Sequence, residues 1–369
     1  MSFTNVRHLI AFVSFFALAS IYANQSIITF TFICMANDAN DTILVDGTLR
    51  QRYDYTTQEK SWLISVAGLG TLLATFPVTH LFAKYGARHL FFLFGFISCL
   101  FTFFLPWAAA QGYWTLMIFR FLQGLSLATD FTTIGMICVD WAPLKEFSTF
   151  IGVLVTFTVL STIFTNPVSA WFCETDGLGW QYSFYAHAAV GILFMTVWWL
   201  LYRDDPAQHF AVTKRELRVI QRDKSAEHID TTKRGDVPYL KMLTNPTILV
   251  CWVAAFLEIS SGILIIIYAP IYLNKVLLYD VITTGFLVSI MGLVQIPFRT
   301  MFCLSSDHVR FVSERHKMLF FNFLAFVVCG IAYASIGLTP YREVSVFLFC
   351  CVSALCSATC GSFYKCVNF

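Results

Sequence analysis

The chain has 369 residues, of which 57% are apolar and only 12% carry a charged side chain. Soluble domains carry about a quarter charged residues, so this composition excludes an ordinary soluble protein with a charged, water-exposed surface. The net charge of +2, without a basic patch interleaved with aromatic residues, gives no support for nucleic-acid binding. The sequence therefore predicts a protein that is embedded in a lipid bilayer.

Ten apolar runs are long enough to cross about 30 Å of hydrocarbon as helices. In chain order they occupy residues 9–35, 61–83, 90–110, 111–139, 147–173, 177–202, 246–274, 281–304, 318–340 and 344–369. The first run is far longer than the core of a signal peptide, so we expect it to be a retained helix. These runs predict an all-α membrane protein.

A strongly charged segment separates the first six runs from the last four. It holds 16 charged residues between positions 203 and 246. Two helical bundles joined by such a segment are the plan of a two-halved transporter. We therefore expect an N-terminal six-helix bundle at 1–202, a charged cytoplasmic linker at 203–246, and an incomplete C-terminal bundle of four helices at 247–369.

The basic residues indicate how the runs are oriented. With a cytoplasmic N-terminus, cytoplasmic segments hold 16 of the 24 lysines and arginines and the outer loops hold five. The first outer loop, 36–60, contains the sequon Asn40-Asp41-Thr42, so Asn40 is a predicted glycosylation site. Cys34 and Cys173 both fall near the outer face and could pair, whereas the other cysteines are interpreted as small buried side chains and not as metal ligands.

Charged residues within the runs are costly in hydrocarbon and need a partner or a function. Arg120 and Asp130 stand ten residues apart in one run, ~15 Å along a helix, so they cannot pair with each other. Arg120 either faces an anion in a central cavity or forms a structural contact near the outer end of its helix. Asp130 is either a proton site or an inert, neutral acid.

The seventh run contains Glu258, which small and polar residues follow. This pattern is typical of an interrupted helix that lines a transport path, or of close helix packing. Glu258 could pair with Arg120 across a cavity, or it could be a buried, protonated glutamate. Tyr22 and Gln25 in the first run supply uncharged hydrogen-bonding groups, and His187 is interpreted as a packed or hydrogen-bonded histidine.

Six short segments occur in an order that is typical of one transporter family. They are "RFLQG" (120–124), "DWAPLKEFS" (140–148), "WQYSFY" (180–185), "DDPAQHFAVTKRELRVI" (204–220), "YAPIYLNKV" (268–276) and "TTGFLVS" (283–289). Together they resemble the anion:cation symporter family of sialin, the vesicular glutamate transporters and the sodium-phosphate cotransporters. The resemblance implies the twelve-helix major-facilitator fold, of which this chain would hold ten helices and lack the last two.

The sequence departs from that family at several intramembrane positions. Gln25 stands where the family has an arginine in its first helix, and Leu127 and Gly135 replace the glutamate and histidine of its fourth helix. Glu258 stands where the vesicular glutamate transporters have an arginine, and the family has no acid at Asp130. A glutamine amide can donate hydrogen bonds to an anion but supplies no charge.

The residues and the resemblance together predict secondary transport of a small organic or inorganic anion by alternating access, coupled to protons or sodium. The candidate substrate-binding residues are Arg120, Glu258, Gln25, Tyr22 and Asp130. The alternative is a non-transporting truncated or regulatory member of the same fold. No enzyme, metal or cofactor is predicted, because the sequence has no GxxxxGK[ST] loop and no catalytic cluster at a membrane face. The expected location is the plasma membrane or a vesicular or lysosomal membrane.

Overall fold

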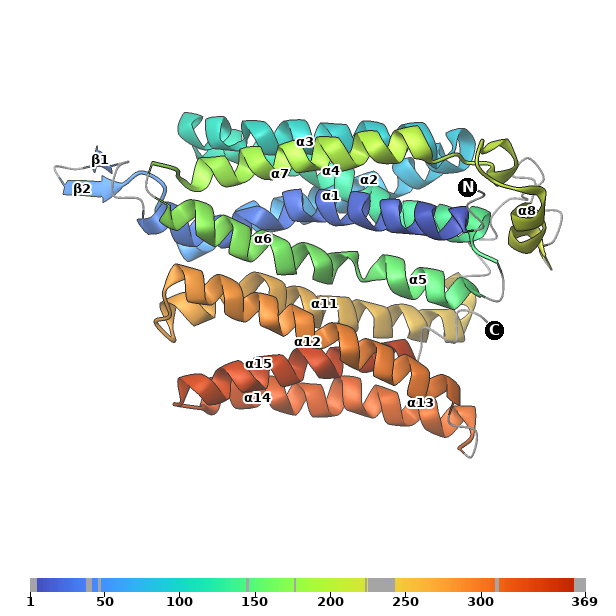
Figure 1. Ribbon diagram of the computed structural model, residues 1–369. Coiled ribbons are helices and arrows are strands. Elements are labelled where there is room, and N and C mark those ends of the chain that lie inside the picture. Colours follow the sequence, from blue (N-terminus) through green and yellow to red (C-terminus); the bar gives the residue numbers. More distant parts are fainter. Residues whose placement is uncertain are drawn as a thin grey trace. The chain divides into compact units, whose positions relative to one another are not determined.

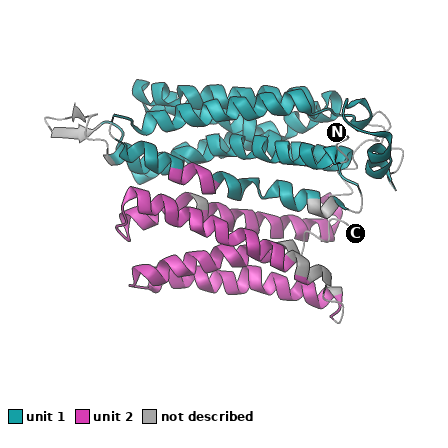
Figure 2. Cartoon of the chain, in the orientation of Figure 1, with its two compact units in different colours: residues 1–161, 168–234 teal, residues 162–167, 235–369 magenta. Residues whose placement is uncertain are grey.

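The computed structural model describes residues 5–37, 42–45, 48–143, 146–175, 177–222, 224, 243–308 and 312–361 (Figure 1). In this part of the chain, ten helices are long and apolar enough to cross a membrane, as the sequence predicted. The chain divides into two compact units, residues 1–161 with 168–234 and residues 162–167 with 235–369 (Figure 2). Each unit is described separately below.

The first unit is built around five helices that pack against one another. They are α1 (Val6–Asn37), α2 (Thr57–Tyr85), α3 (Ala87–Gln111), α4 (Tyr113–Trp141) and α7 (Trp180–Leu201). Its core contains large buried aromatic side chains, among them Phe91, Trp141 and Trp198. Trp198 satisfies its indole N–H by donating to the Ser14 hydroxyl of α1 at 2.9 Å, because a buried donor without an acceptor is costly.

One predicted span, 147–173, is divided into α5 (Phe147–Val155) and α6 (Phe157–Glu174). The hydroxyl of Thr156 donates to the Gly152 carbonyl at 2.8 Å, and the Thr156 backbone N–H bonds to Val153 three residues earlier at 3.2 Å. A threonine hydroxyl that occupies the carbonyl four residues earlier competes with the helical ladder. The break at Thr156 coincides with this hydrogen bond, which apolar periodicity does not reveal.

Close backbone contact between α2 and α4 depends on two glycines. A Cβ atom at Gly124 would clash with the Ala67 carbonyl of α2, and one at Gly70 would clash with the Phe121 carbonyl of α4. Thr71 adds a hydrogen bond from its hydroxyl to the Gly124 carbonyl at 2.8 Å. Small residues allow membrane helices to approach this closely, which explains the glycine of "RFLQG".

The segment after α7 binds three helix ends of the first unit. Asp204 accepts hydrogen bonds at 2.7 and 3.0 Å from the first two backbone N–H groups of α3. Glu216, on the short helix α8 (Lys214–Gln221), accepts one at 3.0 Å from the Arg7 N–H at the start of α1. Lys224 donates to two carbonyls of the last turn of α4 at 2.7 and 3.2 Å. Acids thus meet helix N-termini and a base meets a C-terminus, as the helix dipole favours.

The segment between α1 and α2 contains an antiparallel hairpin of β1 (Thr42–Val45) and β2 (Thr48–Gln51). Thr42 lies opposite Gln51 and Val45 lies opposite Thr48. The sequence had predicted only an outer loop here. The predicted glycosylation site, Asn40, lies outside the described residues.

The second unit holds the four predicted spans that follow residue 246. They are α11 (Pro246–Lys275), α12 (Val281–His308), the continuous series α13 (Glu314–Asn322), η4 (Phe323–Val328) and α14 (Cys329–Leu338), and α15 (Arg342–Cys356) with η5 (Ser357–Gly361). Its main core joins α11, α12, α14 and α15 through residues such as Leu273, Met291 and Phe349. The π-helical turn η4 was not predicted, because a π-turn adds one residue without interrupting the apolar run.

Candidate functional site

Arg120 lies on α4 and is 2% exposed. Its Nε donates to the Leu63 carbonyl of α2 at 3.3 Å, and its Nη1 donates to the Gln25 carbonyl of α1 at 3.1 Å. Nη1 also donates to the side-chain oxygen of Gln123, one turn along α4. The guanidinium is therefore fixed by oxygens from three helices, while Nη2 makes no hydrogen bond to the described residues.

Gln123 is a residue of the Arg120 network that sequence reasoning missed. Its amide nitrogen donates to the Asn24 carbonyl of α1 at 2.6 Å and to the Thr102 hydroxyl of α3 at 2.7 Å. Because its oxygen accepts from Arg120, this one side chain joins α1, α3 and α4 around the guanidinium. Its position three residues after Arg120, on the same helical face, was the available signal.

Ion pairs do not neutralise Arg120 within the described part of the chain. The arginine–carboxylate ion pair found there joins Arg7 and Glu146, near the start of α1, at 3.1 Å. The oxygens around Arg120 are neutral carbonyl and amide oxygens. These groups carry only partial charge, so the guanidinium is held in place while its positive charge remains largely unbalanced.

Gln25 and Tyr22 lie one turn apart on α1, next to this arrangement, and both are partly exposed. Gln25 uses its backbone carbonyl to accept from Arg120, while its side-chain amide makes no hydrogen bond to any described residue. The Tyr22 ring packs edge-to-face on Phe157 at a centroid distance of 5.5 Å. The structure thus brings Arg120 and Gln25 together and leaves the Gln25 amide available to a solute.

Asp130 is fully buried on α4, and neither of its carboxyl oxygens has a hydrogen-bond partner among the described residues. It is not part of the hydrogen-bond network around Arg120 and Gln123. Tyr22 of α1 lies close enough for an ionised Asp130 to act on it electrostatically.

Glu258 belongs to the second unit, so its pairing with Arg120 stays a prediction. Its Oε1 accepts a hydrogen bond from the Thr359 hydroxyl at 3.1 Å, and its backbone carbonyl accepts from the Ser261 hydroxyl at 2.8 Å. The Tyr333 hydroxyl of α14 donates to the Ser261 carbonyl at 2.5 Å. Within its own unit, Glu258 is therefore part of a polar cluster that joins α11, α14 and η5.

Two further expectations about single residues are confirmed. His187 has its Nδ1 2.8 Å from the Ser183 carbonyl, so it is a hydrogen-bonded histidine within α7. Cys34 and Cys173 form a disulfide with a Cα–Cα distance of 5.9 Å. This bond joins the C-terminal ends of α1 and α6.

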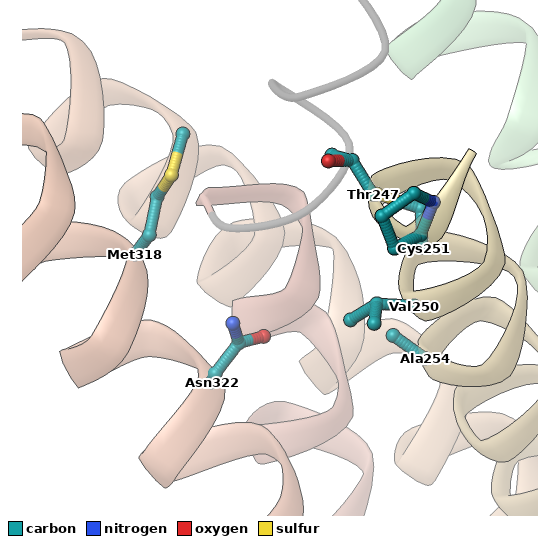
Figure 3. Close-up of a pocket in the computed structure, with 7 residues that line it drawn as sticks. Thr247, Val250, Cys251, Ala254, Met318 and Asn322 are labelled. Carbon is teal, nitrogen blue, oxygen red and sulfur yellow. The ribbon is translucent and has the colours of Figure 1, made fainter.

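A cavity of about 410 Å³ lies in the second unit, between α11 and α13 (Figure 3). Thr247, Val250, Cys251 and Ala254 line it from α11, and Met318 and Asn322 line it from α13. None of the five predicted substrate-binding residues contributes to this cavity. Its surface is mostly apolar and offers no cation to an anionic solute.

The ten apolar helices of the described residues, with an arginine buried among them, are the features of a multi-pass membrane protein. The chain belongs to the major facilitator superfamily, whose sequence model matches residues 14–368. The predicted all-helical major-facilitator fold is therefore confirmed.

Similar proteins include members of the family that the sequence segments indicated. The chain is 26% identical to the probable small intestine urate exporter of Mus musculus, over 77% of this chain and 61% of that protein. It is also 26% identical to sodium-dependent phosphate transport protein 1 of Oryctolagus cuniculus, over 78% of this chain and 63% of that protein. The chain thus spans about three fifths of the length of these curated relatives.

Solved structures show the same fold. A bacterial homologue of the human lysosomal transporter Spinster, in an inward-facing conformation, superposes with a TM-score of 0.67 at 15% identity. The match covers 98% of this chain and 74% of that one. At this identity the likeness shows the fold alone.

Proposed function

We propose that this chain belongs to a secondary transporter that moves a small organic or inorganic anion by alternating access, coupled to protons or sodium. The observation that carries the proposal is the environment of Arg120. Its guanidinium is 2% exposed, held by neutral oxygens, and keeps Nη2 without a hydrogen bond to the described residues. A buried cation of this kind is best balanced by an anion.

The geometry of an arginine suits carboxylate, urate or phosphate groups in particular. A planar guanidinium presents parallel N–H donors to two oxygens of an anion, which a lysine ammonium does not. Gln25, whose side-chain amide is unused, is proposed to donate a further, uncharged hydrogen bond. Tyr22 and Glu258 are proposed to contribute from α1 and from the second unit.

The names of the relatives support an anionic solute. One is described as an exporter of urate and another as a sodium-dependent transporter of phosphate, and both solutes are small anions. The alternative is a non-transporting regulatory protein of the same fold. In such a protein no bound anion would offset the cost of burying the Arg120 guanidinium without a carboxylate partner.

The disulfide supports the proposed orientation. Cys34 and Cys173 lie at the ends of α1 and α6 that are remote from the N-terminus and from the charged segment after α7. Structural disulfides form in oxidising compartments outside the cytosol. We therefore propose that the N-terminus is cytoplasmic and that Asn40, in the outer loop, carries a glycan. From the sequence we also propose the division into an N-terminal bundle at 1–202, a linker at 203–246 and a C-terminal bundle at 247–369. The plasma membrane or a vesicular or lysosomal membrane fits this arrangement.

Transport of labelled phosphate and urate into proteoliposomes tests the proposal. The reconstituted full chain is expected to take up at least one of these anions, and Arg120→Lys is expected to impair uptake at equal amounts of folded protein. Arg88→Lys, at the start of α3, is the matched control and is expected to transport normally. Normal uptake by Arg120→Ala would exclude a role for Arg120, and no uptake of either anion by the unaltered chain would favour the regulatory alternative.

A further inference from the structure

Asp130 carries a carboxyl group for which the first unit provides no partner. It is fully buried, and neither Oδ1 nor Oδ2 accepts a hydrogen bond from a described residue. An ionised carboxylate without a donor is among the most costly groups to bury, whereas a protonated one costs no more than other neutral polar groups. The geometry therefore favours the protonated form in the state that the structure shows.

Two hydroxyl groups near Asp130 are also unsatisfied. Ser126 precedes it by four residues and Thr133 follows it by three, so all three side chains lie on the same face of α4. Both residues are fully buried, and neither hydroxyl oxygen has a hydrogen-bond partner among the described residues. This face of α4 therefore holds four unsatisfied oxygen atoms within two helical turns.

Few charged or titratable groups face this site from the elements packed against α4. Tyr22 of α1 is the titratable residue with an electrostatic interaction to Asp130. None of the described lysines, arginines or histidines forms an ion pair or hydrogen bond with Asp130. The charge on Asp130 can therefore be removed by a bound proton but not by a neighbouring side chain in this conformation.

We propose that Asp130 is a proton-binding site and that a proton is the coupling ion of the proposed transport. This inference rests on the proposed function and names its coupling ion. A divalent metal cation would need about six oxygen ligands, whereas this face offers a single acidic side chain. The described residues also contain no group of three or more acidic, histidine or cysteine side chains suited to a metal.

Helix α1 provides a physical link between the proton and the anion. Arg120 binds the backbone of α1 at Gln25, and Tyr22, one turn away on α1, lies within electrostatic range of an ionised Asp130. Along α4 the two charged residues are ~15 Å apart, so they do not compete for one ligand. A movement of α1 when an anion binds at Arg120 would change the surroundings of Asp130, which is what coupling requires.

The test combines a spectroscopic and a transport measurement on the full chain and on Asp130→Asn. The amide keeps the size and neutrality of a protonated acid, so the variant is expected to fold. Infrared difference spectra are expected to show a protonated carboxyl band that is absent from Asp130→Asn and disappears reversibly as the pH is raised. A band that does not respond to pH, or that responds to sodium instead, would overturn the proposal.

Transport then separates failure of the proton site from failure of the proposed function. In proteoliposomes, Asp130→Asn is expected to exchange labelled phosphate or urate at equal pH but to lose accumulation driven by a proton gradient. Thr132→Ala, on another face of the same helix, is the control and is expected to keep proton-driven accumulation. Proton-driven accumulation by Asp130→Asn would overturn the proton site while transport stands. A carboxyl band that titrates, without any transport by the unaltered chain, would support the proton site but contradict the proposed function.

Discussion

At the scale of single residues, Gln123 determines how Arg120 is held. Its amide makes three hydrogen bonds, to Arg120, Asn24 and Thr102, in a fully buried position between α1, α3 and α4. Removing one partner of a buried hydrogen bond leaves the other group unsatisfied, at about 1–3 kcal/mol. Gln123 therefore fixes the position of the Arg120 guanidinium and also links α1, α3 and α4.

We therefore expect Gln123→Ala to lower the free energy of unfolding by about 1–3 kcal/mol. Gln111→Ala is the control, because Gln111 is exposed at the end of α3, and a change within about 0.5 kcal/mol is expected there. Denaturant unfolding of the purified chain in detergent provides the measurement. Equal stabilities of the two variants would show that the Gln123 network does not stabilise the bundle.

His209, in the segment between α7 and α8, is expected to make the stability of the first unit depend on pH. The Ala211 N–H donates to Nδ1 at 3.2 Å, so Nε2 carries the proton and donates to the Leu201 carbonyl at 3.0 Å. This arrangement requires a neutral ring, and burial lowers the pKa of His209. The folded-state pKa therefore lies below the unfolded value of about 6.5. The stabilisation is complete above that pH and is lost as pH falls below it.

We expect the stability difference between the unaltered chain and His209→Ala to shrink as pH falls from about 7 to 5. His80→Ala is a suitable control, because His80 is exposed on α2 and makes no hydrogen bond or ion pair with the described residues. Unfolding temperatures across this pH range provide the measurement. A difference that grows towards acid would show that His209 is stabilised in its charged form.

At the scale of helices, the sequence predicted the ten spans but not their irregularities. Apolar runs mark the spans because lipid requires long apolar helices. The break at Thr156 and the π-turn η4 depend on local hydrogen bonds, which leave the apolar pattern unchanged. Arg120 stood out because charge is rare in hydrocarbon, whereas its acceptor at Leu63 is a backbone carbonyl that only helix packing brings near.

Asp204 links two elements, because it caps α3 from the segment after α7. Its side chain also lies beside Gly86, where a Cβ atom would come within 2.7 Å of the carboxylate. We expect Asp204→Ala to lower the free energy of unfolding by about 0.5–2 kcal/mol, as for other lost N-caps. The neighbouring Asp205→Ala is the matched control, since Asp205 caps only the three-residue turn η2 (Pro206–Gln208). An equal or larger loss for Asp205→Ala would contradict the role assigned to Asp204.

At the scale of the whole molecule, the Cys34–Cys173 disulfide and the charged segment provide a test of topology. In sealed membranes with the cytoplasmic face outward, a protease is expected to remove an N-terminal tag. Cys34→Ser releases the Cys173 thiol on the far side, so an impermeant maleimide is expected to label it only after permeabilisation. Cys34→Ser with Cys173→Ser is the control for background labelling. Labelling of Cys173 in sealed membranes would reverse the proposed orientation.

The central claim is that Arg120 binds the anion, and equilibrium binding to the purified full chain tests it most directly. Labelled phosphate and urate are the probes, and the unaltered chain, Arg120→Lys, Arg120→Ala and Arg88→Lys are compared at equal folded protein. We expect Arg120→Ala to abolish binding, Arg120→Lys to weaken it because the planar donor pair is lost, and Arg88→Lys to leave it unchanged. Binding by Arg120→Ala with the affinity of the unaltered chain would contradict the claim.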